Sequence, residues 1–575
     1  MSNFILKILE TRELKLNTIR LRGFYGGKLR KGSGGGGSGD GFPQLPGDVT
    51  RWHFGGLTNE MMAAMDNPRL EDADHKGRFL SFKNFAWDGM SGCDGYTESF
   101  LGDKINWKSE IHNSRKVSVF EGNRSRVSVI HNQYHFQTYV KISGINDNEG
   151  KVRGVYFYNM ESELTEGTIC RTDGIYKIDI TESNKRGVVG IWAYPAKKNE
   201  DVYDYPVTIE ILPLYPGALV FDGVDDYGVC DNFPILTKEK GYTVVALRQW
   251  ITYNPNTISA IATNASDQSF NGAFTFEYLQ KGLERTISYG STQISLSYSK
   301  SPFSWQTTSK YNGVDINNGN KEATNSLALG RAYPQRNESA NFAIWELVFL
   351  DHDATEEELT KIKDYFVKTY PWLFFDQAWT VVGKTNEDED RATIANITGN
   401  GNDLVLSNFG FAEGSGYNEE GEYAGYLVTD GVDDKITSSA FKMGKDWTVV
   451  GDWKFINDES KNAGIIKPSS LYVYNALNGV SIFINSGSIG NNIKENKGFN
   501  AICSNGRAYD RNWTEYSELK VEEVTKSNSE LKIGASSNDT TYTRMAFKNF
   551  AIYPKVLSKD DCIKAYNYLQ TLKAK

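Results

Sequence analysis

The sequence predicts a mainly β protein that contains several antiparallel sandwiches and few helices. Aromatic residues make up 13% of the 575 residues, and short runs of β-branched and aromatic residues alternate with turn-forming residues. One nine-residue segment, 219–227, recurs at 427–435, which indicates a duplicated domain. A chain of this length exceeds one hydrophobic core, so we expect several domains.

The charge and the hydropathy pattern argue against two classes of partner. The formal net charge of −9 is spread along the chain, which argues against a nucleic-acid-binding protein. No stretch approaches the roughly 20 apolar residues that a membrane-spanning helix needs, so we expect no membrane insertion. The first residues lack the pattern of a secretion signal, so we expect synthesis in the cytoplasm.

Five cysteines are scattered singly, without a Cys-x-x-Cys pair. They are Cys93, Cys170, Cys230, Cys503 and Cys562. This odd, dispersed set argues against a disulfide scaffold and against a zinc ribbon. We therefore expect a protein that is made in a reducing compartment and that needs no cofactor.

Residues 1–31 are predicted to form a basic arm, with eight Lys or Arg against two Glu. Apolar residues alternate over 14–22, as in a strand with one apolar face. An isolated strand has to pair with another sheet, so we interpret the arm as an anchor, and a frayed terminus is the alternative. The candidate anchor residues are Arg12, Lys15, Arg20, Arg22, Lys28 and Arg30. Residues 32–41, mostly Gly and Ser, would form a flexible tether.

Residues 42–114 are predicted to be a small aromatic-rich domain with a capped helix near 58–65. The density of aromatic residues indicates a small core or a subunit interface, and a carbohydrate platform is the alternative. These residues are Trp52, Phe54, Phe79, Phe82, Phe85, Trp87, Tyr96, Phe100 and Trp107.

Residues 115–216 are predicted to be an immunoglobulin-like β-sandwich that acts as a spacer. Turn residues separate several strand-like runs in this region. The runs lie at 139–142, 155–158, 176–180, 188–194 and 207–211. Six or seven short strands in about 100 residues are typical of such a sandwich.

Residues 217–375 and 376–575 form the duplicated pair. Three further markers recur in the same order, and each copy ends in a capped amphipathic helix. The markers are Tyr242-Thr243-Val244-Val245 with Trp447-Thr448-Val449-Val450, Leu327-Ala328-Leu329-Gly330 with Leu531-Lys532-Ile533-Gly534, and Phe342-Ala343-Ile344-Trp345 with Phe550-Ala551-Ile552-Tyr553. A lead-in from Trp379 to Phe411 is expected only in the second copy.

This order of markers, over residues 217–575, resembles the concanavalin A-like lectin/glucanase superfamily in its laminin G-like branch. The resemblance implies two tandem concanavalin A-like jelly rolls, each with its Asp-Gly turn at an edge of the sandwich. The second copy, through Ala392 to Gly401, is similar to modules in structural proteins of phages that infect Bacteroides-type bacteria, including the crAss-like phages.

The sequence gives no support to hydrolysis. A glucanase of this superfamily carries Glu-x-Asp-x-x-Glu on one strand, so that the acid and the nucleophile project from one face. That spacing is missing, and the acidic run 387–390 is predicted to be a solvated turn. The six histidines fall almost wholly outside the repeats, which argues against Ser-His-Asp chemistry. We therefore expect that the protein is not an enzyme.

Each copy of the nine-residue segment contains three aspartates, at 222, 225 and 226 and at 430, 433 and 434. Three carboxylates in one turn are a candidate calcium site, but we favour a turn whose side chains bond its own amides, with no metal. Candidate sugar-binding residues are aromatic residues that could stack on a sugar and asparagines that could bind its hydroxyls: Tyr472, Tyr474, Trp305 and Tyr311, with Asn475 and Asn478. Composition does not separate these residues from core residues, so no glycan-binding residue is assigned.

Together these features predict a structural protein at the virion surface of a tailed phage, as a head or tail fibre or a capsid decoration. The arm would bind capsid or tail proteins, and the chain would form a homotrimer. The sandwiches would bind host-surface glycans, with an avidity that comes from several linked sites. The alternatives are a bacterial or prophage-derived glycan-binding surface protein and, less favoured, a polysaccharide depolymerase. The sequence leaves open whether the sandwiches are only spacers.

Overall fold

The structure, a computed structural model, describes residues 41–574 apart from a set of short segments. The segments outside the description are 101–104, 107–108, 114, 120–125, 131–135, 146–151, 160–166, 172, 181–187, 196–206, 238, 253–257, 267–272, 281–282, 288–292, 296–300, 317–323, 399–401, 442, 457–460, 467–470, 477–478, 485–486, 494–497, 517–529 and 537–538. The predicted anchor arm and its six basic residues lie outside the described residues, so their role stays a prediction.

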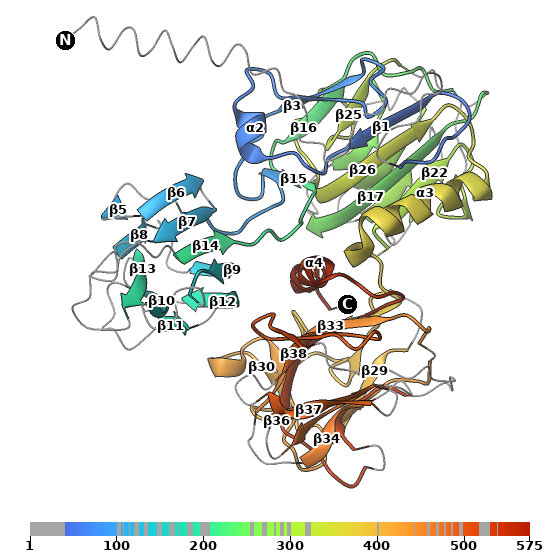
Figure 1. Ribbon diagram of the computed structural model, residues 1–575. Coiled ribbons are helices and arrows are strands. Elements are labelled where there is room, and N and C mark those ends of the chain that lie inside the picture. The colour runs from blue at the N-terminus through green and yellow to red at the C-terminus, as the bar shows by residue number, and fades with distance from the viewer. Residues whose placement is uncertain are drawn as a thin grey trace, which may run out of the picture. The chain divides into compact units, whose positions relative to one another are not determined.

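The first sandwich consists of two eight-stranded antiparallel sheets that share one hydrophobic core (Figure 1). One sheet has the order β24 (314–315), β23 (310–311), β22 (303–307), β17 (243–252), β26 (341–350), β15 (219–222) and β4 (92–93), and β1 (49–53) also pairs with β26. The other sheet has the order β2 (69–71), β3 (79–83), β16 (227–230), β25 (327–329), β18 (258–263), β19 (275–280), β20 (283–287) and β21 (293–295).

Strands β1 to β4 belong to the first sandwich, so residues 42–114 are not the separate small domain that the sequence suggested. Strand β1 pairs with β26 along its five residues, and β3 pairs with β16. Trp52 and Phe82 lie in the same core as Phe349. In Figure 1 the dark blue β1 and β3 lie beside the green and yellow strands of this sandwich. A short strand with one apolar face buries it only against a larger sheet.

The second sandwich repeats the strand order of the first, strand for strand. One sheet has the order β40 (515–516), β39 (508–510), β38 (499–503), β33 (448–455), β42 (545–553), β31 (426–428) and β30 (416–418), and β27 (377–380) also pairs with β42. The other sheet has the order β28 (393–394), β29 (404–407), β32 (435–437), β41 (532–535), β34 (461–466), β35 (471–476), β36 (479–484) and β37 (487–493). The duplication that the sequence predicted therefore extends to the whole topology.

The lead-in of the second copy has a counterpart in the first, which corrects the expectation that the copies differ at their start. Trp52 opposes Leu347 in the pair β1–β26, and Trp379 opposes Phe550 in the pair β27–β42. Both tryptophans are fully buried. The sequence carries a signal for this equivalence, because Asn-Phe-x-Trp at 84–87 and Asn-Phe-x-Phe at 408–411 are each followed by Ser-Gly.

The last of the sequence markers was matched in the wrong register. Thr243 opposes Leu350 in the first sandwich, and Thr448 opposes Tyr553 in the second, so Leu350 and Tyr553 are equivalent. The sequence match instead paired Trp345 with Tyr553, a slip of five residues. An odd slip moves every side chain of a strand to the opposite face, so only the strand pairing fixes this alignment.

A third sandwich is inserted into the first, between β4 and β15. It contains two five-stranded antiparallel sheets around its own core. One sheet has the order β11 (167–170), β10 (152–159), β13 (188–195), β8 (126–130) and β5 (105–106). The other has the order β12 (174–180), β9 (136–143), β14 (207–211), β7 (116–119) and β6 (109–113). The predicted β-sandwich at 115–216 is thus present, with strands that begin earlier than expected.

The helices are few and begin at side-chain caps. Helix α2 (59–63) starts after Thr58, α3 (356–369) after Thr355 and α4 (559–570) after Ser558, and each cap accepts a backbone amide of the first turn. Two 3-10 turns, η2 (371–373) and η3 (421–423), complete the described helical elements. None of the helices in the described residues has the length and hydrophobicity to cross a membrane.

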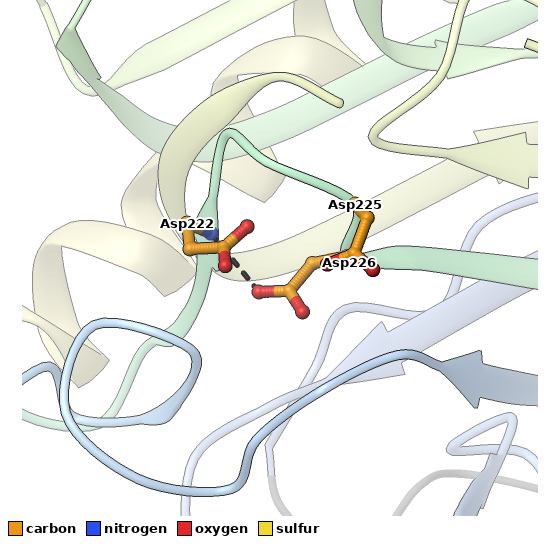
Figure 2. Close-up of side chains that lie close together, drawn as sticks. All are labelled: Asp222, Asp225 and Asp226. Atoms are coloured by element: carbon orange, nitrogen blue, oxygen red, sulfur yellow. Dashed lines mark hydrogen bonds between the residues drawn. The ribbon is translucent and has the colours of Figure 1, made fainter. Parts of the chain in front are cut away.

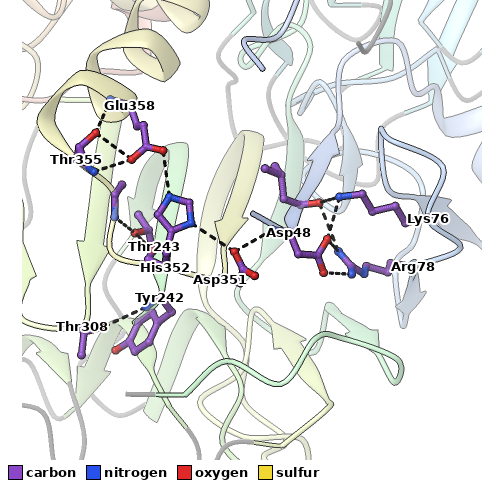
Figure 3. Close-up of polar contacts among 12 residues, drawn as sticks. Asp48, Lys76, Arg78, Tyr242, Thr243, Thr308, Asp351, His352, Thr355 and Glu358 are labelled. Atoms are coloured by element: carbon purple, nitrogen blue, oxygen red, sulfur yellow. Dashed lines mark hydrogen bonds and ion pairs between the residues drawn. The ribbon is translucent and has the colours of Figure 1, made fainter. Parts of the chain in front are cut away.

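One threonine in each sandwich ties a sheet to the helix that follows, and Figure 3 shows the one in the first sandwich, Thr243. Thr243 Oγ1 donates a hydrogen bond to the His352 carbonyl at 2.7 Å and accepts one from the Ala354 amide at 2.8 Å. The equivalent Thr448 makes the same two bonds, at 2.8 and 2.9 Å, to the segment before α4. This explains why a Thr-Val-Val segment marks both copies.

A second polar chain holds the start of α3 (Figure 3). Thr355 and Glu358 form a capping box, and His352 Nε2 lies 3.1 Å from Glu358 Oε1. Burial alone would raise the pKa of Glu358, but the bonds from Thr355 and His352 hold that pKa below its usual value. Asp351 Oδ1 accepts the amide of Asp48 at 2.9 Å, which ties the residues before β1 to the same corner.

Candidate functional site

The Asp-Gly turn of the first sandwich connects β15 to β16 and crosses from one sheet to the other. Gly223 takes a φ of 79°, a left-handed conformation that glycine adopts without strain. Asp222 Oδ1 accepts the amide of Val224 at 2.7 Å, and Asp226 Oδ2 accepts the amide of Asp222 at 3.0 Å. Figure 2 shows Asp222 and Asp226 facing each other across the turn.

Asp226 is the buried member of this turn. Its side chain is fully buried, and its second oxygen, Oδ1, accepts a hydrogen bond from Ser91 Oγ at 2.9 Å. Burial raises the pKa of Asp226 to about 7, against the lowering effect of the bonds from the Asp222 amide and Ser91. Desolvation favours the neutral form of the carboxyl, which is why a group with several donors still has a high pKa.

The turn of the second sandwich has the same geometry. Asp430 Oδ1 accepts the amide of Val432 at 2.7 Å, and Asp434 Oδ2 accepts the amide of Asp430 at 2.8 Å. Burial raises the pKa of Asp434 to about 6. In both copies an asparagine of the preceding strand region caps the turn: Asn408 Nδ2 donates to the Asp433 carbonyl at 3.0 Å, as Asn84 does in the first copy at 3.2 Å.

Each turn has the residue types of a cation site, since carboxylate oxygens from its three aspartates all lie within 4.8 Å of one another. The hydrogen bonds favour the other interpretation. Oxygens of two of the three carboxylates already accept backbone amides, so an ion would compete with bonds that hold the turn together. The arrangement therefore fits a turn that is closed by its own side chains.

A buried carboxylate joins the two sheets of the first sandwich. Glu277 of β19 is fully buried and takes a φ of 49°, which is strained for a residue with a side chain. Its oxygens accept bonds from Arg248 Nε and Trp250 Nε1, each at 2.7 Å, from Tyr311 Oη at 2.9 Å, and from Ser304 Oγ. Burial would raise the pKa of Glu277, but the charge and the hydrogen bonds of Arg248 hold it below its usual value.

The sheet that contains β17 and β26 carries a second buried carboxylate on its outer face, Glu346 of β26. It lies 3.3 Å from Arg51 NH1 and 2.6 Å from His53 Nδ1. Tyr370 Oη donates to Glu346 at 2.9 Å, and the Tyr365 hydroxyl lies 3.4 Å away. The cluster joins β1, β26, α3 and the residue before η2, so it serves packing rather than a solvent-facing reaction.

The predicted sugar-binding residues differ in how far they are buried and in whether the structure describes their side chains. Tyr311 is buried and bonded to Glu277, so it is not free to stack on a sugar. Trp305 is half-buried, on β22. The structure does not describe the side chains of the other four candidate sugar-binding residues, Tyr472, Tyr474, Asn475 and Asn478. The acidic run 387–390 is a turn, as predicted, and Asp388 caps Thr385 within it.

Sequence reasoning missed the most connected polar residues. Arg248 and Glu277 lie in strands with no catalytic or binding motif around them, so nothing local marks them as partners. Ser91 is different, because a Ser-Gly pair recurs at the same place in the second copy. Aligning the Asn-Phe segments before it would have found this residue and its role beneath the Asp-Gly turn.

Comparisons with known proteins assign no family. No protein-family profile matches the chain, and no curated protein matches its sequence. The chain is structurally similar, at a low level, to receptor-binding domains of botulinum neurotoxins. It shares 9% identity and a TM-score of 0.25 with that of the C/D mosaic serotype, over 58% of this chain and 88% of that one. For the serotype D binding domain the values are 9%, 0.25, 60% and 90%.

A further structure of this group is the binding domain of botulinum neurotoxin DC in complex with SialylT. Its identity is 9% and its TM-score is 0.20, over 57% of this chain and 87% of that chain. Similarity at this level fixes neither the domain arrangement nor a ligand of the present protein.

Proposed function

We propose that this protein is a non-enzymatic recognition protein that displays two lectin-like sandwiches to carbohydrate on a cell surface. One observation carries the proposal: the chain builds the same pair of eight-stranded sheets twice. The side chains that the copies share, such as the Thr243 and Thr448 clamps, hold this frame. A frame that is repeated while its connections differ is the arrangement of a display scaffold.

The state of the buried carboxylates supports a non-enzymatic role. Glu277 is bonded to Arg248, and Asp452 of β33 lies 3.0 Å from Arg511 NH1. Asp226, whose raised pKa is the feature expected of a general acid, is fully buried under its turn. A general acid has to reach the substrate atom that it protonates. These three carboxylates are therefore structural.

The setting that we propose is the surface of a phage particle. The resemblance of the second copy to phage structural modules supports it, together with the basic arm and the glycine-rich tether. In this proposal the arm binds capsid or tail proteins, and three chains associate as a homotrimer. Two sandwiches per chain and three chains per assembly would give weak single sites a large avidity.

A glycan array tests the binding proposal. The full chain is applied to bacterial surface polysaccharides and sialylated oligosaccharides, each printed at high and low density. We expect binding that is stronger on dense spots by about 10²-fold or more, because linked sites raise the effective concentration. Binding to no carbohydrate, or release of oligosaccharides that mass spectrometry detects, would overturn the proposal.

Particle incorporation tests the setting separately. Removal of residues 1–31 should abolish incorporation into phage particles while glycan binding by the purified chain is kept. Normal incorporation of the shortened chain would show that the arm is not the anchor. Light scattering on the full chain tests the trimer, and a monomer at micromolar concentration would contradict it.

A further inference from the structure

The second sandwich brings together two of the five cysteines. Cys503 is the last residue of β38, and Cys562 lies in the first turns of α4. Both side chains are fully buried, and the two thiols influence each other: Cys562 lowers the pKa of Cys503, and Cys503 raises the pKa of Cys562. Two residues 59 positions apart in the chain are thus neighbours, one at the end of a strand and one in a helix.

One threonine joins the strand that carries Cys503 to the segment just before the helix that carries Cys562. Thr448 opposes Cys503 in the strand pair β33–β38, and its Oγ1 lies 3.6 Å from Cys503 Sγ. The same Oγ1 donates to the Lys555 carbonyl at 2.8 Å and accepts the Leu557 amide at 2.9 Å, just before α4 begins. The Cys562 amide then bonds the Ser558 carbonyl in the first turn of that helix. The clamp therefore holds the end of β38, with Cys503, beside the start of α4, with Cys562.

The first sandwich shows that the frame does not need these cysteines. Thr307 opposes Thr243 there, as Cys503 opposes Thr448. The Leu359 amide bonds the Thr355 carbonyl at 3.0 Å, as the Cys562 amide bonds the Ser558 carbonyl at 2.9 Å. Threonine and leucine thus occupy the two equivalent positions. The cysteine pair is an addition to one copy of a shared frame.

We propose that Cys503 and Cys562 are a modification site, which forms an intramolecular disulfide when the protein meets a small-molecule disulfide such as oxidised glutathione. The bond would join α4 covalently to the sheet of the second sandwich. A cross-link that closes a loop of this length restricts the unfolded and locally opened states. The expected result is a C-terminal helix that no longer opens.

The reaction is a thiol–disulfide exchange in two steps. The Cys503 thiolate attacks one sulfur of oxidised glutathione, forms a mixed disulfide and releases one glutathione thiolate. The Cys562 thiolate then attacks the Cys503 sulfur, forms the protein disulfide and releases the second glutathione thiolate. Two protons leave the cysteines, and two electrons reduce the glutathione disulfide.

The test uses the full chain, prepared with reductant and then transferred into excess oxidised glutathione. Hydrogen exchange of residues 559–570 first measures how often α4 opens, and the incubation lasts for many such openings. Peptide mapping without reductant should then find the Cys503 and Cys562 peptides cross-linked and lighter by two hydrogen atoms. Amide exchange in α4 should slow at least about tenfold after oxidation, and dithiothreitol should reverse both effects.

A matched control carries Cys503→Thr and Cys562→Leu, the residue types of the first sandwich at these positions. It should fold, and oxidised glutathione should leave its α4 exchange unchanged. Cys230→Ser, in the first sandwich, should keep the full effect. The proposal is overturned if α4 has opened many times and both cysteines remain free, carry separate glutathione groups, or pair with other cysteines.

Discussion

The two large sandwiches have the same strand order but are filled differently at one end of equivalent strands. Arg248 and Trp453 occupy the same position after a bulge in equivalent strands, as do Trp250 and Phe455. In the first sandwich this position holds an ion pair with Glu277, and in the second it holds two aromatic rings packed edge to face, 5.7 Å apart. The strand order therefore does not depend on this part of the interior, which agrees with the finding that buried ion pairs can often be replaced by apolar residues.

A second difference lies in one connection. In the second sandwich β30 ends at Asn418 and β31 begins at Tyr426, whereas in the first the equivalent strands end at Cys93 and begin at Leu219. The first sandwich carries the whole inserted sandwich there. Connections whose ends lie close together accept inserted domains, because the frame on either side is unchanged. The two copies show that this frame tolerates changes in its interior and a large insertion in one connection.

The largest expected effect comes from breaking the ion pair of the first sandwich. Arg248→Met leaves the Glu277 carboxylate buried without its cation, and we expect the first sandwich to lose about 3–5 kcal/mol of stability. Denaturant unfolding followed by hydrogen exchange of peptides from β17 and β33 should show the loss in β17 alone. Adding Glu277→Gln to the variant removes the charge and should restore much of the stability. No recovery would mean that Arg248 acts through packing rather than charge.

The shared clamp should give equal effects in the two sandwiches. Thr243→Val and Thr448→Val each leave a buried amide without its acceptor and a carbonyl without its donor. We expect each to destabilise its own sandwich by about 2–3 kcal/mol, as judged by the same exchange measurement. Thr360→Val, which removes an exposed bond to the Glu356 carbonyl, is the control, with an effect of about 0.5 kcal/mol or less. Unequal losses would show that the two clamps are not equivalent.

The Asp-Gly turns should make stability depend on pH. In the folded chain the pKa of Asp226 is about 7 and that of Asp434 about 6, both above the unfolded value, so folding binds a proton. This stability is fully present below about pH 4 and is lost as the pH rises through the folded pKa, at no more than about 1.4 kcal/mol per pH unit for each group. Asp226→Asn should therefore be more stable than the parent at about pH 8, and Asp434→Asn should show the smaller gain. Unfolding midpoints at about pH 5 and about pH 8 measure this, and equal values at both would contradict it.

The smallest expected effect is that of calcium. If the aspartates close their own turns, millimolar calcium or a chelator should change the free energy of unfolding of either sandwich by about 0.5 kcal/mol or less. A larger stabilisation near neutral pH, lost in Asp222→Asn or Asp430→Asn, would assign a calcium site to that turn. If calcium stabilised only one sandwich, the two turns would differ in cation binding despite their shared geometry.

The sequence by itself determined the local elements of this protein. The Asp-Gly-Val-Asp-Asp turns, the threonine and serine caps of α3 and α4, and the Thr-Val-Val strands each follow from residues close together in the chain. Their recurrence was enough to predict a duplicated β domain. These features are readable because turns and caps satisfy their backbone groups with neighbouring side chains.

Only the tertiary structure decided which strands share a sheet and which side chains meet. Strand β1 joins β26 across nearly 300 residues. The alignment of β26 with β42 differs by five residues from the one that the sequence markers suggested. Glu277 finds Arg248, and Cys503 finds Cys562, through the packing of whole elements. Such pairings rest on long-range backbone hydrogen bonds and on burial of a common core, and neither leaves a local pattern in the sequence.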